Sequence, residues 1–163
     1  MADDTSGRPS GAAGGRGSRT VRQFRRSRAR RAVDAVMSAF TRAGLVPSTF
    51  LLTTTGRRTG KPLTHPATVV EHEGRLWLVA PYGAVSWVHN ARSVGQVRLT
   101  RRRQRHDYAV REVPATEAGP VLKRYLRVAT AARPYFRATK DSPVEDFVAE
   151  ADRHPVFELR PIT

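Results

Sequence analysis

A chain of 163 residues without cysteine is long enough for one domain with its own core, and it excludes a disulfide scaffold, a thiolate nucleophile and cysteine-based zinc or iron–sulfur sites. Its formal charge of +15 favours polyanions such as nucleic acid, anionic lipid or a phosphorylated cofactor, without choosing among them. No apolar run approaches the roughly 20 residues that span a bilayer, and the five histidines show no metal-ligand spacing with carboxylates, so no metal is predicted.

The N-terminal part of the chain is strongly basic. Residues 1–19 are rich in Gly, Ser, Arg and Ala and hold no large apolar residue after the first, which predicts a disordered basic tail. Over residues 20–44 apolar side chains recur at three- and four-residue steps, which predicts an amphipathic basic helix that Gly44 and Pro47 terminate. Residues 1–31 contain nine basic and two acidic residues, a net charge of +7.

Two roles are open for this predicted helix. It could pack on the domain as ordinary core, or it could lie at the inner face of the plasma membrane, with arginines toward anionic headgroups and Phe24 and Phe40 toward the acyl chains. Asp34 interrupts the apolar part of the Arg-rich stretch and no cleavage site follows, so an export signal is not expected. The predicted location is therefore the cytoplasm, with peripheral membrane association as the alternative.

After residue 45 the pattern becomes one of short strands joined by tight turns. Gly74 supplies a positive φ for one of these turns, and the basic segment 101–105 forms the tip of another hairpin. This tip is read as solvated, with contact to polyanions as the alternative. Strands are predicted over residues 50–54, 67–71, 75–80, 96–100, 106–113 and 156–160.

Two helices are expected late in the chain. One begins near Pro114 and has an apolar face that includes Leu122 and Tyr125. The other runs to about Asp152 and opens with the sequence Ser-Pro-Val-Glu at 142–145, a capping box with Ser142 as the cap and proline at the first helical position. Together these elements predict a mainly β fold of the α+β class, with a small sheet curled into a barrel over residues 45–163.

The turn between the first two strands has an unusual composition. Gly56 and Gly60 flank Arg57 and Arg58, and Lys61 follows. Glycines let backbone N–H groups converge on an anion, and the three cations add charge where a phosphate or carboxylate would bind. The sequence matches neither a Walker loop nor a dinucleotide fingerprint. The turn is therefore either an anion cradle or a plain solvated basic turn.

Four runs bear on this choice by their order and spacing: LLTTTGRRTGKPLTHP, GRLWLVAPYG, SWVHNARSVGQVRL and HPVFELRP. They resemble the deazaflavin-dependent nitroreductase family of actinobacteria over about residues 50–161. That family is similar to the flavin-dependent split β-barrel oxidoreductases and uses coenzyme F420. The resemblance implies a split β-barrel of about six antiparallel strands with flanking helices, F420 as the cofactor in preference to FMN, and no metal.

The resemblance also implies which residues bind the coenzyme. The basic turn would hold its phosphate and glutamate tail, the next strand would run beneath the ring, and two later segments would edge and close the site. Leu63 stands where better-known members carry a basic residue, and Lys61 could supply that charge. The implied coenzyme-binding residues are Arg57, Arg58, Thr59, Lys61, Leu63, Thr64, His65, Pro66, Ala67, Thr68, Val79, Ala80, Pro81, Tyr82, Ser86, Trp87, Val88, His89 and Asn90.

The implied reaction is hydride transfer from the reduced deazaflavin to an electron-poor quinone, enone or nitro compound. Tyr82 or Ser86 could donate the proton, as could solvent, and Tyr135 is the candidate for the substrate pocket. Two alternatives remain: a basic nucleic-acid-binding domain, although the Arg-rich tip lacks interleaved aromatics, and a member of the same fold that binds flavin or lipid without turnover. Specific nucleic-acid binding is not expected, and the protein is a monomer or a homodimer.

Overall fold

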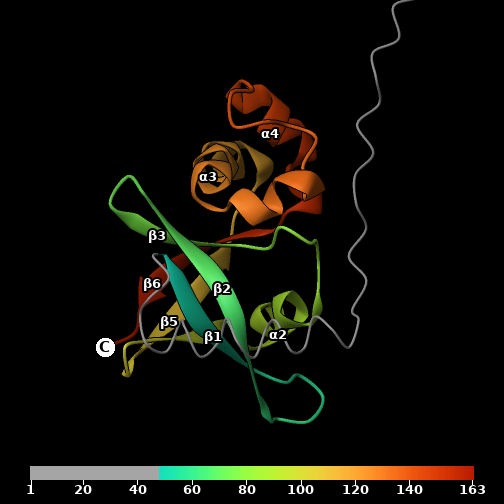
Figure 1. Ribbon diagram of the computed structural model, residues 1–163. Coiled ribbons are helices and arrows are strands. Elements are labelled where there is room, and N and C mark those ends of the chain that lie inside the picture. Colours follow the sequence, from blue (N-terminus) through green and yellow to red (C-terminus); the bar gives the residue numbers. More distant parts are fainter. Residues whose placement is uncertain (1–47) are drawn as a thin grey trace, which may run out of the picture.

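The computed structural model describes residues 48–163 (Figure 1). The predicted basic tail and the predicted helix over 20–44 lie outside the described residues and stay predictions. Over 48–163, none of the helices is both long and apolar enough to traverse a lipid bilayer. In chain order the elements are β1 (Thr49–Thr55), β2 (Pro62–His72), β3 (Arg75–Val79), α2 (Ser86–Val94), β4 (Gln96–Arg101), β5 (Gln104–Glu112), α3 (Ala115–Val128), η1 (Thr130–Tyr135), α4 (Val144–Glu150), η2 (Ala151–Arg153) and β6 (Val156–Pro161).

The six strands close into an antiparallel barrel in the order β1-β2-β3-β6-β5-β4. This confirms the predicted α+β, mainly β barrel of six antiparallel strands. The turn between β2 and β3 uses Gly74 at φ 71°, as predicted, and its neighbour Glu73 also has a positive φ of 52°. The tip between β4 and β5 is a two-residue turn in which Arg102 and Arg103 both adopt positive φ, 49° and 66°.

Strand β2 begins five residues earlier than the sequence suggested. Its first half pairs with β1, from Pro62 opposite Thr55 to Thr68 opposite Thr49, whereas only residues 69–72 pair with β3. The two prolines in this half weakened the strand pattern, because proline cannot donate to a sheet ladder. Within residues 48–163 the second edge of 62–68 pairs with no other strand, so proline is tolerated there. We call this edge the open seam of β2, although the barrel itself is closed.

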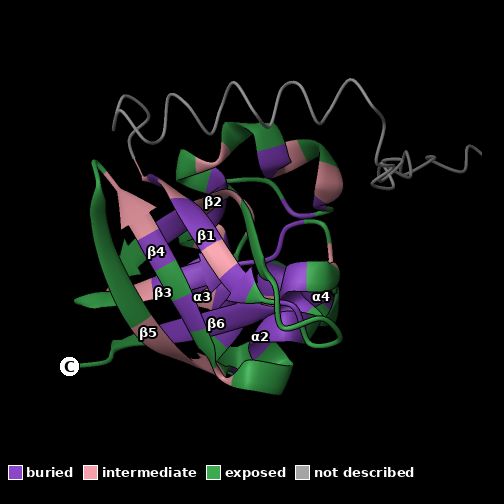
Figure 2. Cartoon of the chain, turned by 90° about the horizontal axis from the view of Figure 1, so that it is seen from below, coloured by how far each residue is buried: buried purple, intermediate pink, exposed green. Residues whose placement is uncertain are grey.

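The fold has two hydrophobic cores that share strands. One fills the barrel interior and includes Leu52, Leu78 and Phe157. The other lies outside the barrel, where α3 and its neighbours cover β3 and β6 through residues such as Val79 and Val156. Side chains alternate between the two faces of a strand, so a strand covered on both sides reads as a continuous apolar run. Figure 2 shows β6 buried along most of its length.

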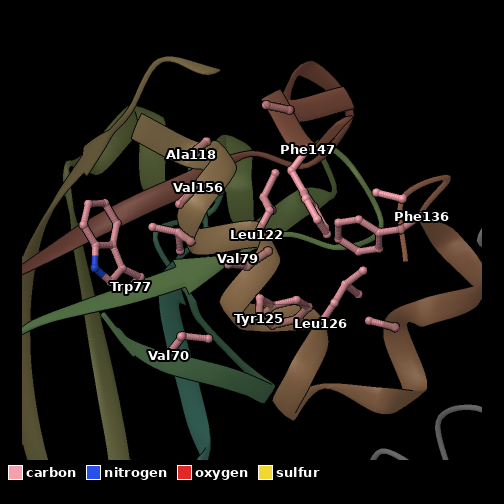
Figure 3. Packing of buried hydrophobic residues seen from close by; sticks show 14 of the residues in the cluster. Val70, Trp77, Val79, Ala118, Leu122, Tyr125, Leu126, Phe136, Phe147 and Val156 are labelled. Atoms are coloured by element: carbon pink, nitrogen blue, oxygen red, sulfur yellow. The ribbon is translucent and has the colours of Figure 1, made fainter. Parts of the chain in front are cut away.

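The outer core is built mainly from α3 and the segments that follow it. Leu122 and Tyr125 lie on the buried face of α3, which confirms the predicted apolar stripe. Phe136 and Phe147, which come from the later segments, point toward this face (Figure 3). Gly119 allows the close approach of α4, because a Cβ there would meet Val148 Cγ2 at 2.5 Å.

The predicted capping box at the start of α4 is wrong. The helix begins at Val144, and Pro143 takes the cap position with ψ 161° and no side-chain cap hydrogen bond. The hydroxyl of Ser142 instead accepts a hydrogen bond from the Thr139 backbone N–H at 3.0 Å. The Ser142 hydroxyl therefore closes the 139–142 turn and does not cap the helix.

Candidate functional site

The basic turn between β1 and β2 is a closed, ordered loop. The Gly56 N–H donates to the Lys61 carbonyl at 2.8 Å, and the Gly60 N–H donates to the Gly56 carbonyl at 2.7 Å. Gly60 has φ 65°, and a Cβ on Gly56 would lie 2.9 Å from Thr59 Oγ1. Both glycines are therefore required by the geometry of the loop, one by its φ and one by close packing. Arg57, Arg58, Thr59 and Lys61 are all exposed on it.

Asn90 fastens this loop to helix α2. Its side chain is 2% exposed, and its Oδ1 accepts from the Arg57 backbone N–H at 3.2 Å and from Arg57 Nη1 at 3.4 Å. Its Nδ2 donates to the buried hydroxyl of Thr54 at 3.3 Å. One amide therefore satisfies the end of β1 and orients the first cation of the loop. The predicted shared face of Trp87 and Asn90 is present, since both are buried on α2.

The open seam of β2 runs from the basic loop toward the barrel interior. Leu63 and Thr64 are exposed, and His65, Pro66, Ala67 and Thr68 are half-buried. The ring of His65 lies 6.1 Å from that of Trp87, centroid to centroid, and Trp87 continues to Phe157 in the interior core at 5.7 Å. The seam thus combines a strand edge that lacks a partner strand with the neighbouring rings of His65 and Trp87.

The segment between β3 and α2 borders the same region. Val79, Ala80 and Pro81 are buried, whereas Tyr82, Ser86 and His89 are exposed. Val79 belongs to the outer core and Val88 to the barrel interior.

Tyr82 packs edge-on against Tyr135 of η1, with ring centroids 4.6 Å apart and planes at 77°. The structure therefore brings the predicted substrate residue Tyr135 to the predicted proton donor Tyr82. Tyr125 is core, 4% exposed, and burial raises the pKa of its phenol, with the nearby Tyr82 adding to this and a hydrogen bond to Thr68 opposing it.

Ion pairing separates two groups of cations on the described surface. Carboxylates neutralise Arg92, Arg98 and Arg111, at 2.6, 2.7 and 2.8 Å. Among residues 48–163, by contrast, no carboxylate pairs with the cations of the basic loop or with the arginines of the β4–β5 tip. The two unneutralised groups lie toward opposite ends of β1, because Thr55 leads into the loop whereas Leu51 pairs with Thr100 beside the tip.

Two buried ionisable residues near the site were missed by the sequence reasoning. Glu150 and His154 are 5% and 3% exposed, and His154 Nε2 lies 3.6 Å from Glu150 Oε2. Their i, i+4 spacing was the available signal. No three His, Cys, Asp or Glu side chains in 48–163 are placed to hold a metal ion.

A family model described as F420H(2)-dependent quinone reductase matches residues 20–146. The chain belongs to this family. Membership confirms the resemblance stated from the sequence motifs, and it makes this family member an F420-dependent reductase in its general activity. No curated protein sequence matches the chain.

Solved structures show where the same fold occurs. One described as a domain-swapped dimer has 23% identity and a TM-score of 0.53, covering 81% of this family member and 96% of its own chain. The heme storage protein HutZ from Vibrio cholerae has 14% identity and a TM-score of 0.50, and the match covers 79% of this chain and 89% of HutZ. An F420-H2 dependent reductase, FDR-A, has 26% identity and a TM-score of 0.46, and the match covers 70% of this chain and 95% of the reductase chain. The first two likenesses concern the fold alone.

Proposed function

We propose that this chain binds coenzyme F420 between the basic loop and the segment that leads into α2, and that it reduces a quinone, enone or nitro compound there. The observation that carries the proposal is the loop itself: Arg57, Arg58 and Lys61 are exposed and have no carboxylate partner among residues 48–163, while buried Asn90 holds the loop in place. A rigid cluster of unneutralised cations fits a phosphate and the carboxylates of a glutamate tail.

The residues along the seam fit the rest of the coenzyme. A planar ring system needs an apolar floor and a few backbone groups at its edge. Residues 62–68 offer backbone that no second strand occupies within the described chain, and Trp87 with His65 offers aromatic surface beside it. His89 and Ser86 lie exposed at the start of α2, where they can close the site.

When bound, the reduced deazaflavin supplies a hydride from its C5 to the electron-poor acceptor. The chain needs only to orient the two molecules and exclude water. Tyr82 and Tyr135 form an aromatic wall on the acceptor side, and the hydroxyl groups of Tyr82 and Ser86 are candidates to deliver the proton, with solvent as the alternative. A wall of aromatic rings suits flat, conjugated acceptors better than aliphatic ones.

The direct test is to titrate the purified protein separately with reduced F420, NADPH and FMN, and to follow oxidation of each by menadione. We expect binding and oxidation of reduced F420 only. Tight binding of FMN without F420 binding would overturn the cofactor assignment. Tight binding of a DNA duplex together with failure to bind F420 would favour the nucleic-acid alternative instead.

The loop assignment has its own test with a matched control. Removing Arg57 and Arg58 together (Arg57→Ala with Arg58→Ala) loses charge-assisted contacts worth about 1.5 to 3 kcal/mol each, so F420 affinity should fall on the order of a hundredfold or more. The control removes the same charge from the other group (Arg102→Ala with Arg103→Ala) and should leave the affinity within about twofold, because at about 0.1 M salt the Debye length is roughly 10 Å. Equal losses in both variants would mean general attraction by net charge.

Homodimer formation and peripheral membrane association stay predictions. Both depend on residues 1–47 or on a second copy of the chain. A truncation that starts at residue 45 is expected to keep soluble-quinone turnover and to lose sedimentation with anionic vesicles if residues 20–44 form the anchor. Full-length protein that stays in the supernatant at low salt would eliminate the membrane role.

A further inference from the structure

We infer that Glu150 and His154 act together as a buried positioning pair that fixes Tyr82 and Tyr135 at the mouth of the proposed site. The role assigned to the two tyrosines rests on the proposed function. The placement of the pair does not, because it follows from contacts within residues 48–163. Neither side chain is in the resemblance-based site, and both are almost completely buried, 5% and 3% exposed.

Glu150 holds the segment that follows Tyr135. Its two carboxylate oxygens accept from the backbone N–H groups of Arg137 and Ala138, each at 2.9 Å. Burial pushes the pKa of this carboxyl upward, but the contact with His154 and the two backbone hydrogen bonds outweigh burial and lower the pKa. The carboxylate is therefore the ionised anchor of two consecutive peptide groups, which fixes the chain just after the Tyr135-Phe136 dipeptide.

His154 holds the segment that precedes Tyr82. Its Nδ1 lies 3.0 Å from the Pro81 carbonyl oxygen. A carbonyl can only accept, so Nδ1 carries the proton of this hydrogen bond. On the other side of the ring, Nε2 faces Glu150 Oε2 at 3.6 Å. The imidazole also stacks on Phe136, with centroids 3.8 Å apart and planes at 15°, so its orientation is fixed in three directions.

The two anchored segments meet at the Tyr82 and Tyr135 rings. Tyr82 directly follows Pro81, Tyr135 directly precedes Phe136, and the Tyr82 and Tyr135 rings are 4.6 Å apart. Glu150 fixes one backbone and His154 fixes the other, and the two side chains contact each other between them. Two buried ionisable side chains in contact contribute little net stability compared with apolar residues of similar size. Positioning the tyrosine pair therefore accounts for this arrangement better than stability does.

The sequence offers a clean spectroscopic test, because the whole chain contains only four tyrosines. Incorporation of 3-fluorotyrosine gives four ¹⁹F signals, which single Tyr→Phe replacements assign. We expect Glu150→Gln, which keeps the size of the side chain and removes its charge, to shift the signals of both Tyr82 and Tyr135. His154→Gln, which removes the Nδ1 donor, should shift the same two signals. Tyr108 on β5 should not respond and serves as the internal reference.

A matched control separates positioning from general loss of stability. Leu99→Ala creates a cavity in the barrel interior, where Leu99 is 2% exposed, and it touches neither segment. At a temperature where all variants are folded, this control should leave the Tyr82 and Tyr135 signals in place. Signals that move equally in the control, or that stay unchanged in Glu150→Gln, would overturn the proposal.

One measurement requires no substitution at all. In histidine-labelled wild-type protein, the ¹⁵N spectrum must show a proton on Nδ1 of His154, since the tie to Pro81 depends on it. A neutral His154 with its proton on Nε2 would overturn the proposal even if every variant failed to fold.

The functional readout distinguishes this inference from the proposed function. If this inference and the proposed function both hold, Glu150→Gln raises KM for the acceptor roughly tenfold, because Tyr82 and Tyr135 are no longer held in place. The affinity for F420 stays near the wild-type value. Wild-type protein that fails to bind F420 refutes the proposed function and leaves the ¹⁹F result to decide the positioning pair. Shifted tyrosine signals with unchanged KM would keep the positioning pair and remove the two tyrosines from the acceptor site.

Discussion

Replacing Asn90 with alanine tests how the basic loop is built. The substitution removes the acceptor for the Arg57 backbone N–H and for Arg57 Nη1, and it removes the donor to the Thr54 hydroxyl. Each net hydrogen bond is worth about 1 kcal/mol, and the Thr54 hydroxyl, 2% exposed, would lose its donor in a buried place. We therefore expect the free energy of unfolding to fall by about 2 to 3 kcal/mol.

The same substitution should weaken coenzyme binding for a separate reason. Without Asn90 the basic loop is no longer held to α2, so Arg57 and its neighbours must become ordered when the coenzyme binds. Ordering one residue costs about 1 to 2 kcal/mol. F420 affinity should then fall by roughly tenfold. Urea unfolding followed by tryptophan fluorescence gives the first quantity, and titration with F420 gives the second.

Ser93→Ala is the control, because Ser93 is exposed on the same helix and outside the site. Asn90→Asp retains an acceptor for the Arg57 N–H, loses the amide donor to Thr54 and adds a negative charge beside Arg57. It should therefore keep the loop attached to α2 while neutralising part of the charge that attracts the coenzyme. A variant Asn90→Ala with wild-type affinity and lowered stability would show that Asn90 supports only the fold. Wild-type values for both quantities would refute the reasoning.

Three further outcomes are expected from the described residues. Arg102→Asn with Arg103→Gly should raise the free energy of unfolding by about 1 kcal/mol, because both positions have positive φ in a two-residue hairpin turn. Urea unfolding measures this, and an unchanged or lowered midpoint would contradict it. Hydrogen bonds from its neighbouring arginines lower the pKa of Glu158 below its ordinary 4.5, so this group stabilises the fold above pH 4.5 and loses that effect as pH falls through the folded-state value. Glu158→Gln should therefore flatten the fall in melting temperature below pH 4.5, and an equally steep fall would refute it. Gly119→Ala should cost about 1 to 3 kcal/mol of stability by steric overlap with Val148 Cγ2, which urea unfolding would measure.

Local patterns predicted the elements whose determinants lie close together in sequence. Alternating or continuous apolar runs located the strands, and Gly74 marked the tight turn between two of them. The proposed anion cradle rests on glycines and cations that are contiguous, so the sequence alone was enough to suggest it. The early start of β2 was not, because Pro62 and Pro66 are acceptable only on an edge that lacks a partner strand, and the sequence does not reveal which edge that is.

Features that depend on distant partners were out of reach. The carboxylate of Glu150 binds the N–H of a residue 13 positions away, and His154 contacts a carbonyl 73 positions away. Neither pairing has a local signature, and the i, i+4 spacing of Glu150 and His154 indicates only that these two side chains can lie close together. The capping box failed for the opposite reason, because a competing local turn used the hydroxyl of Ser142.

The two cores that share β3 and β6 have a consequence for how the molecule opens. Leu78 and Phe157 face the barrel interior while their neighbours Val79 and Val156 face α3, so neither layer can separate without exposing a face of the same strands. The amide protons of these two strands should therefore exchange with deuterium only when the whole domain unfolds, at a rate set by its global stability. The open seam of β2 should exchange through much smaller openings, and this leaves the side of the barrel with the proposed site free to adjust while its opposite side stays rigid.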